Sequence, residues 1–175
     1  MRYFRETAET TFNYTRKHGD AVIGYCDSNY GGDIADRRST TGYVFMIGGG
    51  AVSWCSKRQP TVATSTTEAE YMALSAAAKE AIWFNKNVTN IGLLHIKTIP
   101  VHCDNNSAIN LSKNNMYYTR SKHIDIQHHF VHEVVKNGHI TRKSMPTASM
   151  TADYLTKSVQ RSKHVMCAQS MCLKL

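Results

Sequence analysis

The sequence has no long hydrophobic run, few prolines and few acidic residues in its second half. No stretch approaches the ~20 apolar residues that a membrane span needs. The first six residues, MRYFRE, lack the apolar core of a secretory signal. With three prolines and 42% hydrophobic residues in 175, the chain is neither a proline-rich linker nor a disordered polymer. We therefore expect one compact domain with short tails.

Acidic residues become scarce after residue 80. Residues 1–80 have nine basic and nine acidic side chains, whereas residues 81–175 have twelve basic and four acidic ones. The whole formal net charge of +8 therefore belongs to the second half. Such an excess predicts a polyanionic partner, most commonly a nucleic acid. A solvated basic surface without a partner is the alternative interpretation.

The five cysteines include no CxxC pair and are odd in number, which favours a reduced, intracellular protein over a disulfide scaffold. One group in the C-terminal tail, His164, Cys167 and Cys172, has residue types that bind metal. Its spacing fits no common zinc pattern, so we do not expect a zinc site there.

Periodicity and turn residues predict a mixed α/β domain. Strands are expected over 21–27, 41–47, 51–56, 98–103 and 139–145, and helices over about 65–92, 105–113, 124–136 and 148–157. The first three strands are expected to be antiparallel. Residues 1–19 have no core pattern, residues 159–175 form a basic tail, and Trp54 and Trp83 are expected in the core.

Two of the predicted strands end in an acid, in the sequences Cys26-Asp27 and Cys103-Asp104. Ligand chemistry in α/β sheets gathers at strand ends, and a buried carboxylate is costly without a cation. Carboxylate oxygens are ligands that Mg²⁺ prefers. A turn-forming role for these acids, and a helix-capping role for Asp104, are the alternatives.

Two glutamates lie near the start of the helix that follows Ser65. Glu70 shares a face with alanines and a leucine, so its carboxylate points inward and needs a partner such as a metal ion. Glu68 is the third residue after Ser65 and fits a capping box. A first-turn acid also interacts favourably with the helix dipole, which is the alternative for Glu70 and for Asp153 near the start of the last helix.

Seven blocks of sequence together resemble one family. They are GYCDSNYGGD at 24–33, DRRSTTGYVF at 36–45, VSWCSKRQPTVA at 52–63, STTEAEYMAL at 65–74, CDNNSAI at 103–109, SKHIDI at 121–126 and MPTASMTADYLTK at 145–157. The chain resembles the RNase H domain of copia-type (Ty1/copia) LTR-retrotransposon Pol polyproteins. Residues 2–14 resemble the end of the preceding reverse-transcriptase region, so residues 1–19 are interpreted as its remnant and residues 20–158 as the RNase H domain.

The resemblance implies an RNase H-like fold, a five-stranded mixed sheet with helices on both faces. It also implies an endoribonuclease that uses two Mg²⁺ ions, with Mn²⁺ as an alternative, to cleave the RNA strand of RNA–DNA hybrids. Asp27, Glu70, Asp104 and Asp153 match the catalytic metal ligands. The expected partners are the hybrid and the reverse-transcriptase domain of the same polyprotein, in a cytoplasmic retrotransposon particle or in the nucleus. Residues 146–151 lack the histidine that many RNase H enzymes carry before the last acid.

Contacts to the hybrid backbone are expected from polar and basic residues near these acids. They are Ser65, Thr66, Thr67, Asn105, Asn106, Lys57, Arg58, Arg120 and Lys122, with Arg142 and Lys143 as further candidates. The alternative function is a catalytically silent, retroelement-derived nucleic-acid-binding or interaction module. An integrase is disfavoured because integrases lack the DxRRSTxG and STxEAE blocks.

Overall fold

The computed structural model describes residues 5, 7–14, 19, 21–111 and 122–174. Its main sheet consists of β2 (Ile23–Asn29), β3 (Thr40–Ile47), β4 (Gly50–Arg58), β5 (Ile99–Cys103) and β6 (Ile140–Ser144). The strand order is β4-β3-β2-β5-β6. The β2–β3 and β3–β4 pairs are antiparallel, and the β2–β5 and β5–β6 pairs are parallel. The five-stranded mixed sheet predicted from the sequence is confirmed.

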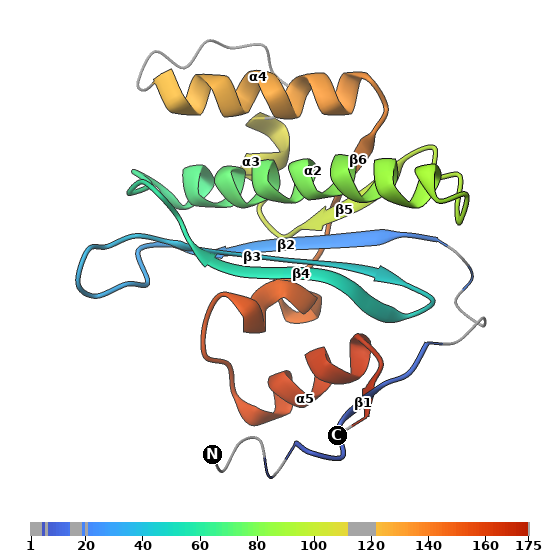
Figure 1. Cartoon of the computed structure of the whole chain (residues 1–175). Coiled ribbons are helices and arrows are strands. Elements are labelled where there is room, and N and C mark those ends of the chain that lie inside the picture. Colours follow the sequence, from blue (N-terminus) through green and yellow to red (C-terminus); the bar gives the residue numbers. More distant parts are fainter. Residues whose placement is uncertain (1–4, 6, 15–18, 20, 112–121, 175) are drawn as a thin grey trace.

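Helices cover both faces of this sheet (Figure 1). Helices α2 (Thr66–Asn90), α3 (Asn106–Leu111) and α4 (Lys122–Lys136) lie on one face. The 3-10 turns η2 (Thr147–Ser149) and η3 (Thr151–Leu155) and helix α5 (Arg161–Ser170) lie on the other. The larger core lies between the sheet and α2, where Phe45, Leu74 and Ile99 are fully buried. A smaller core on the α5 face contains Val44 and Met171.

The N-terminus of α2 is held by side chains that the sequence identifies. Ser65 is the N-cap, and its hydroxyl accepts a hydrogen bond from the Glu68 amide at 3.1 Å. The Glu68 carboxylate accepts from the Thr64 amide at 2.8 Å and from the Thr64 hydroxyl. The Ser65 half of the predicted capping box is confirmed, whereas the Glu68 carboxylate binds Thr64, the residue before the N-cap, and not the Ser65 amide that a capping box uses. At the other end, Gly92 has a φ of +69°, the left-handed conformation that ends a helix.

The prediction of a helix over residues 148–157 is wrong. The chain forms two short 3-10 turns there, because Met150 between them has an extended ψ of 107° and interrupts the helical hydrogen bonds. The Met150 side chain is fully buried. The chain buries this side chain instead of continuing the helix. The following turn, η3, packs against β2 and β3 and contains the buried Asp153.

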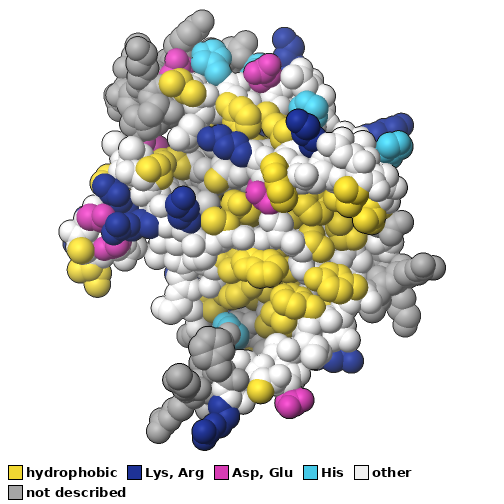
Figure 2. All heavy atoms as spheres, viewed as in Figure 1, with side chains coloured by type: hydrophobic (Ala, Val, Ile, Leu, Met, Phe, Trp, Pro, Cys, Tyr) yellow, Lys and Arg dark blue, Asp and Glu magenta, His cyan; other side chains and the backbone are white. Residues whose placement is uncertain are grey.

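The expectation that both tryptophans belong to the core is also wrong. Trp54 is 56% exposed and Trp83 is 59% exposed. Trp54 lies on β4, which is an edge strand, and its ring stacks on Phe12 at a centroid distance of 6.1 Å. Figure 2 shows hydrophobic side chains gathered in the middle of the face that carries this edge of the sheet. Apolar character alone does not predict burial, because much of a folded surface is apolar.

The described parts of the two terminal segments pack together on the α5 face. Strand β7 (Leu173–Lys174) pairs antiparallel with β1 (Thr11–Phe12). In α5, Cys167 and Ala168 are buried. The basic tail expected over 159–175 thus contains ordered structure. Among the described residues, no helix is both long enough and apolar enough to cross a membrane.

Gly42 on β3 allows η3 to approach the sheet. A Cβ atom at this position would lie 2.6 Å from Thr156 Cγ2, 3.0 Å from Leu155 Cβ and 3.2 Å from the Ala152 carbonyl oxygen. Gly42 is also the β3 partner of Asp27 on β2. The missing side chain therefore permits the close approach of the segment that contains Asp153 to the strand that contains Asp27.

We expect Gly42→Ala to push this segment away from β3 and to destabilise the protein by roughly 1–3 kcal/mol, as overpacking does. Urea denaturation of the metal-free protein measures the effect. Thr40→Ser on the same strand is the control, with an expected change within about 0.5 kcal/mol. Equal unfolding midpoints for Gly42→Ala and the wild type would contradict the close-approach argument.

Candidate active site

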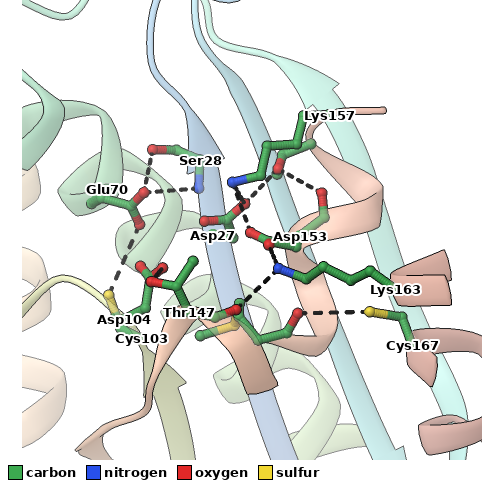
Figure 3. Close-up of polar contacts among 12 residues, drawn as sticks. Asp27, Ser28, Glu70, Cys103, Asp104, Thr147, Asp153, Lys157, Lys163 and Cys167 are labelled. Carbon is green, nitrogen blue, oxygen red and sulfur yellow. Dashed lines mark hydrogen bonds and ion pairs between the residues drawn. The ribbon is translucent and has the colours of Figure 1, made fainter. Parts of the chain in front are cut away.

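The structure brings the four predicted acids together at one end of the sheet (Figure 3). Carboxylate oxygens of Asp27, Asp104 and Asp153 lie within 4.8 Å of one another. Ligand atoms of Glu70, Cys103 and Asp104 form a second group with the same limit. The parallel pairing of β2 with β5 explains why Asp27 and Asp104 lie close together, because it places the carboxyl ends of these two strands at the same end of the sheet. The role of the acids as metal ligands stays a prediction.

Glu70 reaches the site from the first turns of α2, and β2 holds its carboxylate. The Ser28 amide and hydroxyl donate to Glu70 Oε1 at 3.1 Å and 2.8 Å. Cys103 Sγ lies 3.9 Å from Oε2. Burial, aided by the nearby Asp27 and Cys103, raises the pKa of Glu70 to about 9, even though the Ser28 hydrogen bond lowers it. The metal-free site therefore holds Glu70 protonated at neutral pH.

Asp27, at 1% exposure, is almost completely buried beside η3. The Thr156 hydroxyl donates to its Oδ2, and Lys157 Nζ lies 3.8 Å from the same oxygen. Burial raises the pKa of Asp27 to about 7, against the opposing effects of Thr156 and Lys157. The neighbouring Asp153 carboxylate raises it further. These two shifted acids show that the site, without a cation, resists a full set of negative charges.

Asp153 is equally buried but differs from the other two buried acids, because two lysines pair with it. Lys157 Nζ lies 2.8 Å from Oδ1, and Lys163 Nζ of α5 contacts Oδ2. Burial alone would raise the pKa of Asp153, but these two ammonium groups outweigh it and lower the pKa. The lysines therefore favour the ionised form of Asp153, whereas burial favours the protonated forms of Asp27 and Glu70.

Asp104 is the half-buried member of the group. The Thr147 hydroxyl donates to its Oδ2 at 2.7 Å. Helix α3 is capped by Asn105 instead, whose Oδ1 accepts from the Ala108 amide at 3.0 Å. The alternative in which Asp104 caps the helix is therefore wrong. Its carboxylate instead lies in the cluster with the other acids.

The predicted substrate-contacting residues at the start of α2 lie beside this site. Ser65 and Thr66 are exposed, and Thr67 is half-buried. Near Asp104, Asn105 is engaged as the α3 cap, and Asn106 Oδ1 accepts from the Ser144 hydroxyl at 2.7 Å.

The basic residues predicted to contact the hybrid differ in whether they form ion pairs within the protein. Lys57 is exposed on β4. Arg58 lies next to it, but its guanidinium is 3.1 Å from both Asp33 and Asp36, which neutralise it locally. Arg120 and the side chain of Lys122 lie outside the described residues.

Sequence reasoning missed the side chains that position the acids. Ser28, Thr156 and Lys157 occur in the blocks used for the resemblance, so the polar residues flanking the acids were an available signal. Thr147 follows the proline that opens η2. Lys163 had no signal, because nothing in the basic tail predicted that α5 would fold against Asp153.

Comparison with known proteins agrees with this arrangement. The chain is 47% identical over 170 residues to "Retrovirus-related Pol polyprotein from transposon TNT 1-94" of Nicotiana tabacum, covering 97% of this chain and 13% of the relative. It is 35% identical over 162 residues to "Retrovirus-related Pol polyprotein from transposon RE1" of Arabidopsis thaliana, covering 93% and 11%. The chain thus spans a small part of the length of these curated relatives. No protein-family model matches.

Among solved structures, LC11-RNase H1 in complex with an RNA/DNA hybrid superposes with a TM-score of 0.57. The two are 16% identical, and the match covers 77% of this chain and 93% of that one. The fold is therefore that of RNase H. In sequence the chain is a homologue of copia-type transposon Pol polyproteins over nearly its whole length, which confirms the resemblance stated from the sequence blocks.

The raised pKa of Glu70 predicts that this residue destabilises the metal-free protein at alkaline pH. The unfolded chain loses the Glu70 proton near its ordinary pKa, whereas the folded chain retains it up to about 9, so stability falls as pH rises between these values. We expect Glu70→Gln to raise the unfolding free energy at pH 8 by at least ~1 kcal/mol, and to have little effect near pH 4, where both states are protonated.

Urea denaturation in the presence of a chelator, at several pH values, measures this difference. Glu133→Gln, which changes an exposed acid of α4, is the matched control and should have no such pH-dependent effect. A Glu70→Gln protein that is less stable than the wild type at pH 8 would show that the Glu70 carboxylate is not penalised by its burial.

Proposed function

We propose that this protein is a metal-dependent ribonuclease H that hydrolyses the RNA strand of RNA–DNA hybrids. The observation that carries the proposal is the convergence of four carboxylates at one end of an RNase H sheet, from β2, from α2, from the residue that follows β5 and from η3. Residues 20–158 form the catalytic domain in this proposal, and residues 1–19 are the remnant of the reverse-transcriptase region. The activity of the whole Pol polyprotein relatives is not assumed for this chain.

The chemistry of the donor groups fits divalent magnesium. The site offers hard oxygen ligands from Asp27, Glu70, Asp104 and Asp153, which suit Mg²⁺ and also Mn²⁺. Burial raises the pKa values of Asp27 and Glu70 because it disfavours their charged forms, and a bound cation would offset that cost. Two bound ions would activate the attacking water and stabilise the leaving oxygen.

The residues around the acids fix the geometry that such chemistry needs. Ser28 holds the Glu70 carboxylate, Thr147 holds that of Asp104, and Thr156 holds that of Asp27. Each hydroxyl group donates to one carboxylate oxygen and so restricts the orientation of that carboxylate. Hydrolysis through activated water requires no nucleophilic side chain, which agrees with the absence of a catalytic histidine in 146–151.

The hybrid is proposed to lie across the end of the sheet that contains the acids. The exposed Ser65 and Thr66 are at the start of the 25-residue helix α2, where amide groups and the helix dipole favour phosphate. Asp27 on β2 pairs with Gly42 on β3, which pairs with Ser56 on β4. The exposed Lys57, next to Ser56, therefore lies two strands from Asp27 at the same end of the sheet. These groups recognise the backbone rather than the base sequence. The reverse-transcriptase domain is the proposed protein partner.

One observation favours the alternative, a catalytically silent module that binds nucleic acid. Lys157 and Lys163 both pair with Asp153 and satisfy its charge without a metal ion. Under this alternative, the purified protein binds the hybrid but does not cleave it in Mg²⁺ or in Mn²⁺.

Replacement of a proposed ligand by its amide should abolish Mg²⁺-dependent cleavage while the fold is retained. We expect Asp27→Asn and Asp104→Asn to reduce the cleavage rate by roughly 100-fold or more, because the amide removes a charge that the ions require. A gel assay with a labelled RNA–DNA hybrid measures the rate, and circular dichroism checks the fold. Asp125→Asn, on α4, is the control and should retain full activity; cleavage by Asp27→Asn at the wild-type rate refutes the site assignment.

Metal binding should release protons, because Asp27 and Glu70 are protonated over part of the neutral range. We expect Mg²⁺ affinity to rise as pH increases through about 7 and towards about 9, by up to roughly tenfold per pH unit for each proton released. Isothermal titration calorimetry in two buffers of different ionisation enthalpy counts the protons. A proton count of zero, with a flat affinity across this range, would contradict the pKa assignments.

A further inference from the structure

Asp153 is paired with an ammonium group from a part of the chain to which the sequence assigned no role. Lys163 lies in α5, and its Nζ contacts Asp153 Oδ2 (Figure 3). The same nitrogen donates to the Thr147 carbonyl oxygen at 3.0 Å. Only 24% of the Lys163 side chain is exposed, so the charge lies within the site and not above it.

The position of Lys163 is built into the fold. The helix that contains it is anchored by the buried Cys167, whose Sγ donates to the Met150 carbonyl oxygen at 3.8 Å. Thr147 is the first residue of η2 and Met150 directly follows that turn, so both lie in the segment leading to Asp153. Helix α5 therefore packs on the backbone that presents Asp153 and directs Lys163 at its carboxylate.

A lysine and a divalent ion compete for the same carboxylate. Asp153 is one of three aspartates with oxygens within 4.8 Å of one another, the group proposed above to bind metal. An ammonium nitrogen in a charge-assisted hydrogen bond and a magnesium ion both need direct contact with the carboxylate oxygen. Both are positive, so their close approach at one buried carboxylate is unfavourable. Lys157 differs, because it is four residues from Asp153 and bridges towards Asp27 from the adjoining turn.

We propose that Lys163 is the resident cation of the metal-free site and that a divalent ion must displace it from Asp153. The C-terminal helix α5 thereby sets the metal affinity of the site. This inference rests on the proposed function, because it requires the carboxylates to bind a divalent ion. It gives helix α5 a defined role, which is to neutralise the Asp153 carboxylate until a metal ion enters.

The test compares Lys163→Met with the wild type by calorimetric titration with Mn²⁺ and with Mg²⁺, starting from chelator-treated protein. Loss of the competing ammonium group should tighten metal binding roughly tenfold. The same variant without metal should unfold at a lower urea concentration, because Asp153 then keeps a buried charge with one partner fewer. Arg161→Met, an exposed cation on the same helix, is the matched control and should change neither quantity. Lys163→Arg retains the positive charge and should keep the weak metal affinity.

Metal affinity of Lys163→Met equal to or weaker than that of the wild type would overturn the proposal. Asp27→Asn distinguishes a failure of the metal site from a failure of Lys163 displacement. If Asp27→Asn loses metal binding while Lys163→Met matches the wild type, the metal site stands and the displacement of Lys163 fails. If the wild type binds neither ion, both fail. A second measurement needs no variant: the NMR signal of the Lys163 side-chain ε-carbon, assigned with Lys163→Met, should shift in the wild type on saturation with Mg²⁺, and an unchanged signal contradicts displacement.

Discussion

The structure depends on one electrostatic constraint, the burial of several carboxylates beside one another at the end of a sheet. Asp27 and Asp153 are each 1% exposed, and Glu70 is 7% exposed. Their charges cannot all persist in such a place without cations. The protein meets this constraint in two ways in its metal-free state. Asp27 and Glu70 retain protons, whereas Asp153 is neutralised by two lysines.

Several features of the fold follow from the need to hold these groups close together. The parallel pairing of β2 with β5 aligns the strand ends, and the N-terminus of α2 places Glu70 over β2. Gly42 removes the side chain that would keep η3 away from the sheet. The hydroxyl groups of Ser28, Thr147 and Thr156 then fix one carboxylate each. An arrangement that is unfavourable for stability is thus maintained by many contacts, as is common at functional sites.

Much of the fold and of the site could be predicted from the sequence. Short apolar runs bounded by turn residues located the five strands of the sheet, and the STTE sequence located the start of α2, because both signals are local. The acids at strand ends were found for the same reason. The failures all involve tertiary packing. Met150 is buried and breaks the last predicted helix. Trp54 on the edge strand β4 and Trp83 on α2 are both exposed. Lys163 reaches Asp153 only because α5 packs against η3. No local pattern encodes these contacts.

The central claim is that the four converging carboxylates form a site for divalent cations. The most direct test is a crystal structure of the protein grown or soaked in Mn²⁺, analysed by anomalous scattering at the manganese edge. The account predicts anomalous peaks in contact with the carboxylates of Asp27, Glu70, Asp104 and Asp153. Well-diffracting crystals that show no manganese at these carboxylates, or show it bound only elsewhere on the protein, would contradict it.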